Sequence, residues 1–190
     1  MIIYIHGFGG SGEGSKAKAF REYFKEKSEG FIAPSLSYVP ELAIKTLEEL
    51  IESYNEDVFL IGSSLGGFYT IYLSQKYNIK SVLLNPSICP YKTLKNYLGD
   101  APNFYDDSSF TWNENHIKML ENYIQKDVDN SKIMLLVQKG DELLNPQEAL
   151  DKFKDATVIA EDGGNHGFEG ISLYFDRIRK FLLKVDCKNN

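Results

Sequence analysis

The sequence has few of the residues that build disulfide frameworks, metal sites and basic binding surfaces. It contains two cysteines and three histidines, and its 21 Lys and Arg residues are outnumbered by 27 Asp and Glu residues, for a net charge of -6. Cys89 and Cys187 have neither a nearby histidine nor a Cys-x-x-Cys spacing, so we expect both to be structural or incidental. A nucleic-acid partner needs a clustered basic surface, and the scattered Lys and Arg residues argue against one.

Long apolar runs and targeting signals are absent too. No segment approaches the length that spans a bilayer, and no basic stretch followed by an apolar stretch and a small-residue cleavage site precedes the first apolar run. We therefore expect a cytoplasmic protein without a membrane span, whose mature chain begins at Met1. Because no repeat, linker or shift in composition divides the 190 residues, a single domain over residues 1–190 is expected.

What is present is an alternation of short apolar runs with segments of helical period, typical of an α/β fold with a mostly parallel sheet flanked by helices. The alternation breaks after the fourth strand, where residues 86–131 are too long for a crossover helix and rich in aromatic side chains. We interpret them as a short helical cap whose last helix is Glu114–Lys126, with aromatic side chains divided between the cap's own core and a cover for a ligand. About six strands are predicted, at Ile2–Ile5, Phe31–Ala33, Val58–Ile61, Ser81–Leu84, Lys132–Val137 and Thr157–Ile159, with helices at Ser15–Lys27, Glu41–Tyr54, Leu65–Tyr77, Pro146–Phe153 and Ile171–Leu183.

A G-x-S-x-G motif lies between an apolar strand and a helix in DVFLIGSSLGGFYTIYLSQKY. In this context it predicts a nucleophile elbow, a strand-to-helix turn so tight that small residues are needed at Gly62 and Gly66. Ser64 is therefore the candidate nucleophile, whereas the neighbouring Ser63 is not flanked by glycine at both -2 and +2. The N–H group of Leu65, at the start of the helix, would face an oxygen bonded to the attacked carbon.

A serine nucleophile needs a base, and the sequence offers three histidines. His166, in AEDGGNHGF after the last predicted strand, completes the chain order Ser, acid, His that accompanies a nucleophile elbow. Gly163 and Gly164 would let this loop place the imidazole over the serine. His116 lies at a helical position of the cap, where packing or solvent exposure is expected, and His6 ends the first strand.

The carboxylate that orients the base is expected after the penultimate strand, where KIMLLVQKGDELLNP supplies Asp141. Glu142 in the same loop and Asp162 close to His166 are the alternatives, although Asp162 would have to fold back on the histidine. Asp141 is our candidate acid. A carboxylate at this position could also serve only to cap the turn before Pro146.

The opening segment IYIHGFGGSGEGSK contains the string G-x-G-x-x-G at Gly7, Gly9 and Gly12, which is the spacing of a dinucleotide-binding loop. A dinucleotide site also needs an acidic residue at the end of the second strand, and APSLSY offers none. A P-loop needs Gly-Lys followed by Ser or Thr, and the chain has Gly-Ser-Lys instead. The string alone therefore does not predict a nucleotide site.

Taken together, these motifs resemble the α/β-hydrolase superfamily and, more closely, the small bacterial YqiA-type esterases. The resemblance rests on YIHGFGGS, GSSLGGFY, LLNPS, QKGDELL and EDGGNHGFEG, which are spread over nearly the whole chain, and it is weakest in the cap. It implies a minimal α/β-hydrolase fold that lacks the first two strands of the standard sheet. The residues that match the family's site are Ser64 as nucleophile, Asp141 as acid and His166 as base, with the N–H groups of Phe8 and Leu65 as the oxyanion hole.

The sequence therefore predicts a serine esterase or thioesterase that hydrolyses a small-molecule acyl ester or thioester through an acyl-enzyme intermediate, without a metal or organic cofactor. The alternative is a non-catalytic binding protein of the same fold. Such proteins usually lack a member of the triad, and all three candidates are present here. On the esterase hypothesis, the opening glycine loop holds a transient oxyanion rather than a phosphate.

Overall fold

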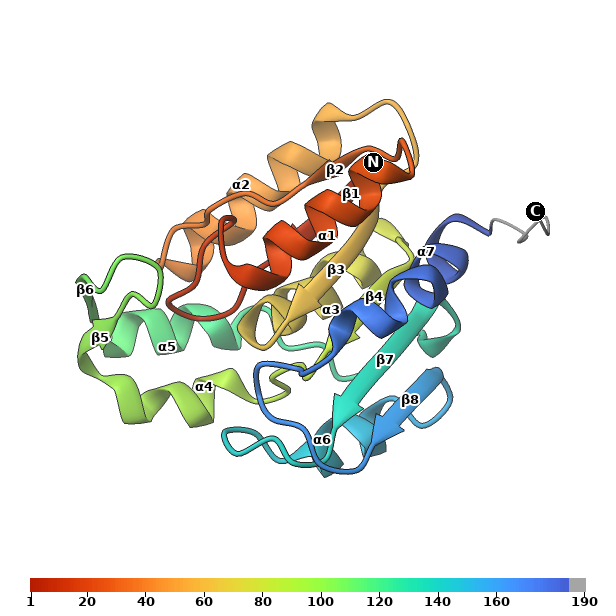
Figure 1. Cartoon of the computed structure of the whole chain (residues 1–190). Helices are drawn as coiled ribbons and strands as arrows, with labels where there is room; N and C mark the ends of the chain where they lie inside the picture. Colours follow the sequence, from red (N-terminus) through yellow and green to blue (C-terminus); the bar gives the residue numbers. More distant parts are fainter. Residues whose placement is uncertain (185–190) are drawn as a thin grey trace.

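The centre of the computed structural model is a six-stranded sheet in the order β2-β1-β3-β4-β7-β8, and every adjacent pair is parallel (Figure 1). The structure describes residues 1–184, so Cys187 lies outside it. The predicted α/β class with six strands is confirmed; β1 and β4 have the predicted bounds, and the ends of the other strands differ from the predicted ones by at most two residues. The strands are β1 (Ile2–Ile5), β2 (Phe31–Ile32), β3 (Phe59–Ser63), β4 (Ser81–Leu84), β7 (Ile133–Gln138) and β8 (Thr157–Glu161).

Helices cover both faces of the sheet, which explains why its strands are continuously apolar rather than alternating. Ile2 and Tyr4 of β1 point to the face covered by α1 and α7, whereas Ile3 and Ile5 point to the face covered by α2 and α3. The helix α6 packs beside α3 against β7. These helices are α1 (Ser15–Glu26), α2 (Pro40–Ser53), α3 (Leu65–Tyr77), α6 (Pro146–Lys152) and α7 (Phe175–Leu183), the last preceded by the 3-10 turn η3 (Ile171–Tyr174).

The cap between β4 and β7 contains helices, as predicted, and also an antiparallel hairpin that the sequence did not predict. The hairpin was missed because its second strand, SFTW, alternates two exposed residues with the half-buried Phe110 and the buried Trp112 over only four positions, too few for a period to stand out. The last long helix ends at Glu121 rather than at Lys126. The cap comprises α4 (Pro90–Thr93), η1 (Leu94–Tyr97), β5 (Gly99–Pro102), β6 (Ser109–Trp112), α5 (Glu114–Glu121) and η2 (Asn130–Lys132).

The chain turns in opposite directions after two adjacent strands, and this divergence creates a crevice at one edge of the sheet. From β1 the chain crosses through α1 to β2, while from β3 it crosses through α3 to β4 on the other side. Ligands of open α/β sheets bind at such a point, beyond the carboxyl ends of the strands. No helix among residues 1–184 is long and apolar enough to cross a membrane.

Candidate active site

Ser64 lies in the turn between β3 and α3 with φ 54° and ψ -121°, a strained conformation for a residue with a side chain. The turn fits because its flanking residues are glycines. A Cβ atom at Gly66 would lie 2.1 Å from the Ile5 carbonyl oxygen, and one at Gly62 would lie 2.4 Å from the Gly66 carbonyl oxygen. The backbone of Ser64 is also held from β4, because its N–H donates to the Leu84 carbonyl at 3.2 Å. The predicted elbow geometry is present.

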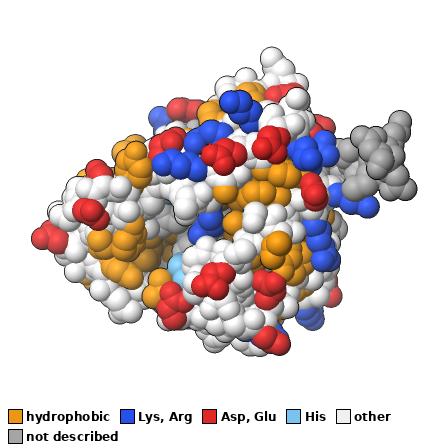
Figure 2. Space-filling model, viewed as in Figure 1, with side chains coloured by type: hydrophobic (Ala, Val, Ile, Leu, Met, Phe, Trp, Pro, Cys, Tyr) orange, Lys and Arg blue, Asp and Glu red, His pale blue; other side chains and the backbone are white. Residues whose placement is uncertain are grey.

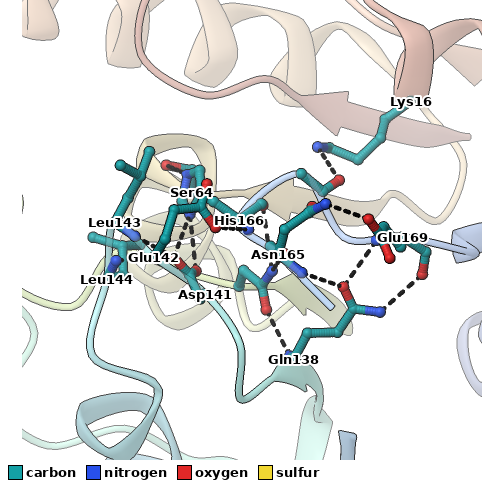
Figure 3. A network of polar contacts seen from close by, with 12 residues as sticks. Lys16, Ser64, Gln138, Asp141, Glu142, Leu143, Leu144, Asn165, His166 and Glu169 are labelled. Atoms are coloured by element: carbon teal, nitrogen blue, oxygen red, sulfur yellow. Dashed lines mark hydrogen bonds and ion pairs between the residues drawn. The ribbon is translucent and has the colours of Figure 1, made fainter. Parts of the chain in front are cut away.

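The three residues expected to form the triad meet at this edge of the sheet (Figure 3). The Ser64 Oγ lies 3.0 Å from His166 Nε2, and His166 Nδ1 lies 2.8 Å from Asp141 Oδ2. An ionised carboxylate only accepts hydrogen bonds, so Nδ1 carries the imidazole proton and Nε2 is free to accept the serine hydroxyl proton. These distances match the geometry that a serine nucleophile, a base and an orienting acid require.

Asp141 is suited to remain ionised next to the histidine. Its side chain is 2 % exposed, and its Oδ1 accepts the N–H groups of Leu143 and Leu144, both at 2.9 Å. Burial raises the pKa of Asp141, but hydrogen bonds from His166 and from these two N–H groups outweigh burial and hold the pKa below its ordinary value. Asp141 therefore caps its own turn and faces the histidine at the same time.

The alternatives considered for the acid and the base have other partners. The Glu142 carboxylate accepts the backbone N–H of His166 at 2.9 Å, so it supports the histidine loop and not the imidazole. Asp162 is 91 % exposed and pairs with Lys139. His116 is buried in the cap, where it forms a capping box with Asn113 at the start of α5.

Two buried polar residues that the sequence analysis did not assign to the site hold the loop that carries His166. Asn85, after β4, donates to the backbone carbonyls of Asn165 and His166 at 3.0 and 3.3 Å. Gln138, at the end of β7, accepts the N–H groups of Asn165 and Glu169 at 3.2 and 2.8 Å (Figure 3). Both lie at the carboxyl ends of apolar strands, and a polar residue at that position was the sequence signal that could have revealed them.

His6 also has a positional role that its place at the end of β1 did not reveal. The Leu36 N–H donates to His6 Nε2 at 3.0 Å, so Nδ1 carries the proton and donates to the Gly7 carbonyl at 2.8 Å. Since the peptide bond is planar and trans, fixing the Gly7 carbonyl also fixes the Phe8 N–H, which points the opposite way. A Cβ atom at Gly7 would lie 3.6 Å from Ser64 Oγ, so this peptide lies against the candidate nucleophile.

The N–H groups of Phe8 and Leu65 remain available as hydrogen-bond donors. Within residues 1–184, neither has a hydrogen-bond acceptor. The Phe8 side chain packs away into the cap, with ring centroids 5.0 Å from Trp112 and 5.4 Å from Phe110 and from Tyr97. The opening loop is thus anchored on the cap, while its free N–H group lies at the edge where the triad meets.

An open cavity of about 1000 Å³ begins at Ser64 and His166 and runs between the opening loop and the cap. Figure 2 shows this face of the molecule hollowed at its centre, with hydrophobic side chains gathered on the cap lobe to the left of the hollow. Of the cap's aromatic residues, Trp112 is buried in the core, while Phe104 and Tyr105 are exposed and line the cavity. Other apolar lining comes from Leu94, Tyr97, Leu143 and Leu144.

Within the described part of the chain, His, Cys, Asp and Glu side chains do not converge at the site as metal ligands would. No group of three or more His, Cys, Asp or Glu side chains among residues 1–184 is arranged to hold a metal ion. The carboxylate and imidazole that meet here, Asp141 and His166, are engaged with each other and with Ser64.

The six-stranded parallel sheet with its elbow defines the class: the protein has the α/β-hydrolase fold. Mouse alpha/beta hydrolase domain-containing protein 10 has the same fold, with a TM-score of 0.77, 21% sequence identity, and coverage of 97% of this chain and 90% of that one. A monoacylglycerol lipase from Paleococcus ferrophilus also matches, with a TM-score of 0.69, 16% identity, and coverage of 96% and 93%.

Within that class, the chain belongs to UPF0227, described as an uncharacterised protein family, whose model matches residues 1–183. UPF0227 protein YcfP from Escherichia coli O9:H4 (strain HS) is 24% identical over 186 residues, which are 95% of this chain and 98% of that protein. The predicted resemblance to small bacterial proteins of the α/β-hydrolase superfamily is confirmed.

Proposed function

We propose that the protein is a serine hydrolase that cleaves small-molecule acyl esters or thioesters. The observation that carries the proposal is the continuous chain of contacts from Ser64 Oγ through His166 to the buried Asp141, at distances of 3.0 and 2.8 Å. The monoacylglycerol lipase with the same fold agrees with ester hydrolysis. The apolar lining formed by Leu94, Leu143 and Leu144 suits an acyl chain.

In the first half of the reaction, the ester becomes an acyl-enzyme. Ser64 Oγ attacks the carbonyl carbon while its proton passes to His166 Nε2, and Asp141 stabilises the resulting imidazolium. The tetrahedral intermediate then collapses, the bond from the carbonyl carbon to the leaving oxygen or sulfur breaks, and the leaving group takes the proton from Nε2. The acyl group is left on Ser64.

In the second half, water replaces the leaving group. His166 Nε2 takes a proton from the water as its oxygen attacks the acyl carbon. When this second tetrahedral intermediate collapses, the bond to Ser64 Oγ breaks and Oγ recovers the proton from Nε2. The carboxylic acid is released and the enzyme returns to its starting state.

The negative oxygen of both intermediates would lie between the N–H groups of Phe8 and Leu65. A preorganised donor of this kind contributes roughly 3 kcal/mol to the stability of the transition state. The bonds from His6 and Gly10 to the Gly7 carbonyl preorganise the Phe8 N–H before substrate binds. The strained backbone at Ser64 does the same for Leu65.

Covalent labelling tests this proposal directly. The protein is incubated with a fluorophosphonate, which reacts with activated serines, and the adduct is located by peptide mass spectrometry. We expect the adduct on Ser64, and we expect Ser64→Ala to abolish both labelling and the hydrolysis of p-nitrophenyl butyrate. Ser63→Ala is the matched control, because it removes the neighbouring hydroxyl, and it should still be labelled.

Two results would count against the proposal. An unlabelled wild-type protein without esterase activity would favour a binding protein that uses the cavity without chemistry. Labelling that persists in Ser64→Ala would place the reactive group elsewhere.

A further inference from the structure

A lysine from the first turn of α1 lies beside the histidine loop. Lys16 lines the cavity, and its Nζ donates to the backbone carbonyl of Gly167 at 2.8 Å (Figure 3). Gly167 follows His166 directly, so the ammonium group lies one residue away from the proposed base. That single bond uses one of the three ammonium protons and leaves two for another acceptor.

Within the described part of the chain, the charge of Lys16 has no counter-ion. No carboxylate among residues 1–184 lies within ion-pair distance of it. Of the acidic residues that line the cavity, Glu13 pairs with Arg21 at 2.9 Å, and Glu142 accepts the His166 N–H. Desolvation lowers the pKa of Lys16, as expected for an ammonium group taken partly out of water without an anion beside it.

The backbone around Lys16 adds to this positive potential. The first turn of α1 has no acidic residue, and its N-cap, Gly14, has no side chain to accept a helix N–H group. Gly14, Ser15 and Ala17 line the same cavity. The free N–H groups and the positive end of the helix dipole therefore act on the cavity in the same direction as the lysine.

A second polar group in the cavity is unused. Ser87 lines it and is 4 % exposed, and its Oγ has no hydrogen-bond partner within the described part of the chain. A buried hydroxyl without a partner is unfavourable unless a ligand supplies one. The cavity thus offers polar donors that no group of residues 1–184 pairs with, in addition to its apolar wall.

We infer that Lys16, with the first turn of α1, binds an anionic group, a carboxylate or a phosphate, on the leaving group of the ester or thioester. We assign the anion to the leaving group because of the mechanism. His166 must protonate the leaving atom, and Lys16 is hydrogen-bonded to Gly167, the residue that follows His166. This inference rests on the proposed hydrolase function. On this inference, the apolar part of the cavity binds the acyl chain of the substrate, and the part near Lys16 binds its anionic alcohol or thiol.

Matched esters test the subsite. The anionic esters are 4-carboxyphenyl butyrate and 4-(phosphonooxy)phenyl butyrate, and the neutral reference is 4-carbamoylphenyl butyrate, with the same acyl group. The readout is kcat/KM for each anionic ester divided by that for the reference, in wild type and in Lys16→Met. Comparing these ratios between proteins cancels the intrinsic reactivity of each ester and any general effect of losing the bond to Gly167.

We expect Lys16→Met to lower at least one of the two ratios roughly tenfold or more, as for the loss of a charge-assisted hydrogen bond, and Lys16→Arg to retain most of it. Lys25→Met is the matched control, since Lys25 lies on the same helix, exposed and outside the cavity, and it should keep the wild-type ratios. If both ratios are unchanged in Lys16→Met, the subsite is overturned.

A second pair of esters, with the anion on the acyl chain, tests whether Lys16 binds the leaving group and not the acyl group. Monophenyl adipate carries its carboxylate on the acyl chain, and its terminal amide is the neutral reference. If Lys16→Met lowers the preference only in this pair, the inference about the leaving group is wrong. If wild type hydrolyses none of these esters and Ser64 is not labelled by a fluorophosphonate, the hydrolase proposal itself fails, and the subsite with it.

Discussion

Two glycine-rich turns follow the adjacent strands β3 and β1, and they are held in different ways. The elbow at residues 62–67 is fixed by backbone atoms of its own turn and of the neighbouring strands, as at Gly66 against Ile5. The opening loop at residues 6–14 is fixed by distant parts of the chain. His6 accepts the Leu36 N–H, and the Gly9 carbonyl accepts the N–H of Phe104 in the cap at 2.7 Å.

The two turns are therefore held in position by different interactions. The elbow is held by close packing, because a Cβ atom added at Gly62 or Gly66 would overlap backbone atoms of the turn or of β1. The opening loop is also closely packed at Gly9 and Gly12, where a Cβ atom would lie 2.4 Å from the Pro102 carbonyl oxygen and 2.0 Å from that of Ala33. Its residues 6–8, however, are held by hydrogen bonds that contribute about 1 kcal/mol each, so this part of the loop can relax when one is lost. A side chain added at Gly66 should therefore affect folding first, whereas loss of a hydrogen bond at residues 6–8 should affect the proposed oxyanion hole first.

The largest effect is expected at Gly66. In Gly66→Ala, the new Cβ would lie 2.1 Å from the Ile5 carbonyl oxygen and 2.5 Å from that of His6, so β1 and α3 must separate. We expect the free energy of unfolding to fall by roughly 3 kcal/mol or more, or the protein to be recovered unfolded. Urea denaturation followed by circular dichroism measures the change.

Gly14→Ala is the control in the opening loop. There a Cβ atom would meet nothing closer than 3.4 Å, and φ is -65°, which any residue adopts. This variant should lose at most about 1 kcal/mol. Equal losses in the two variants would contradict the steric account of the elbow.

The same difference explains what could be predicted from the sequence. The elbow was predictable because it requires small residues only at positions close in sequence. The motif G-x-S-x-G after an apolar strand contains all of them within five residues. The six strands were predictable from their apolar runs. The roles of His6, Asn85 and Gln138 were not, because each depends on a partner at least 27 positions away that a single sequence does not reveal. The cap hairpin was missed since its strands are four residues long.

A smaller effect, on rate, is expected at His6. In His6→Ala, the Gly7 carbonyl loses its 2.8 Å donor and keeps only the 3.2 Å bond from the Gly10 N–H, so the peptide that carries the Phe8 N–H is held less firmly. We expect kcat for p-nitrophenyl butyrate to fall roughly tenfold to a hundredfold with little change in KM, because the donor acts on the oxyanion and not on the bound ester. His6→Asn, which can still donate to Gly7, should recover part of the rate.

His116→Ala is the matched control for a buried histidine. It removes the capping box of α5, so we expect a loss of about 1 kcal/mol in stability while kcat is kept. If His6→Ala and His116→Ala lower stability equally and neither changes kcat, His6 has no role in positioning the proposed oxyanion hole.

The smallest effect is a pH dependence that belongs to the opening loop and not to the elbow, whose residues 62–67 do not titrate. Burial lowers the pKa of His6 from the ordinary 6.5, so the unfolded chain takes up a proton at a higher pH than the folded one. Stability from the neutral imidazole is thus complete above pH 6.5 and is lost as pH falls below it, with a slope of at most about 1.4 kcal/mol per pH unit for one group.

Urea midpoints measured between pH 7.5 and 5, a window chosen to bracket the ordinary histidine value of about 6.5, test this dependence. We expect His6→Asn to have a shallower slope than wild type. Some slope should remain, because burial also lowers the pKa of His116. The pKa of Asp141 is lowered as well, but a depressed carboxylate loses its stabilisation at more acidic pH, so it does not enter this window. An unchanged slope in His6→Asn would mean that His6 is protonated as readily in the folded protein as in the unfolded chain, and its bond from the Leu36 N–H would then not hold the opening loop.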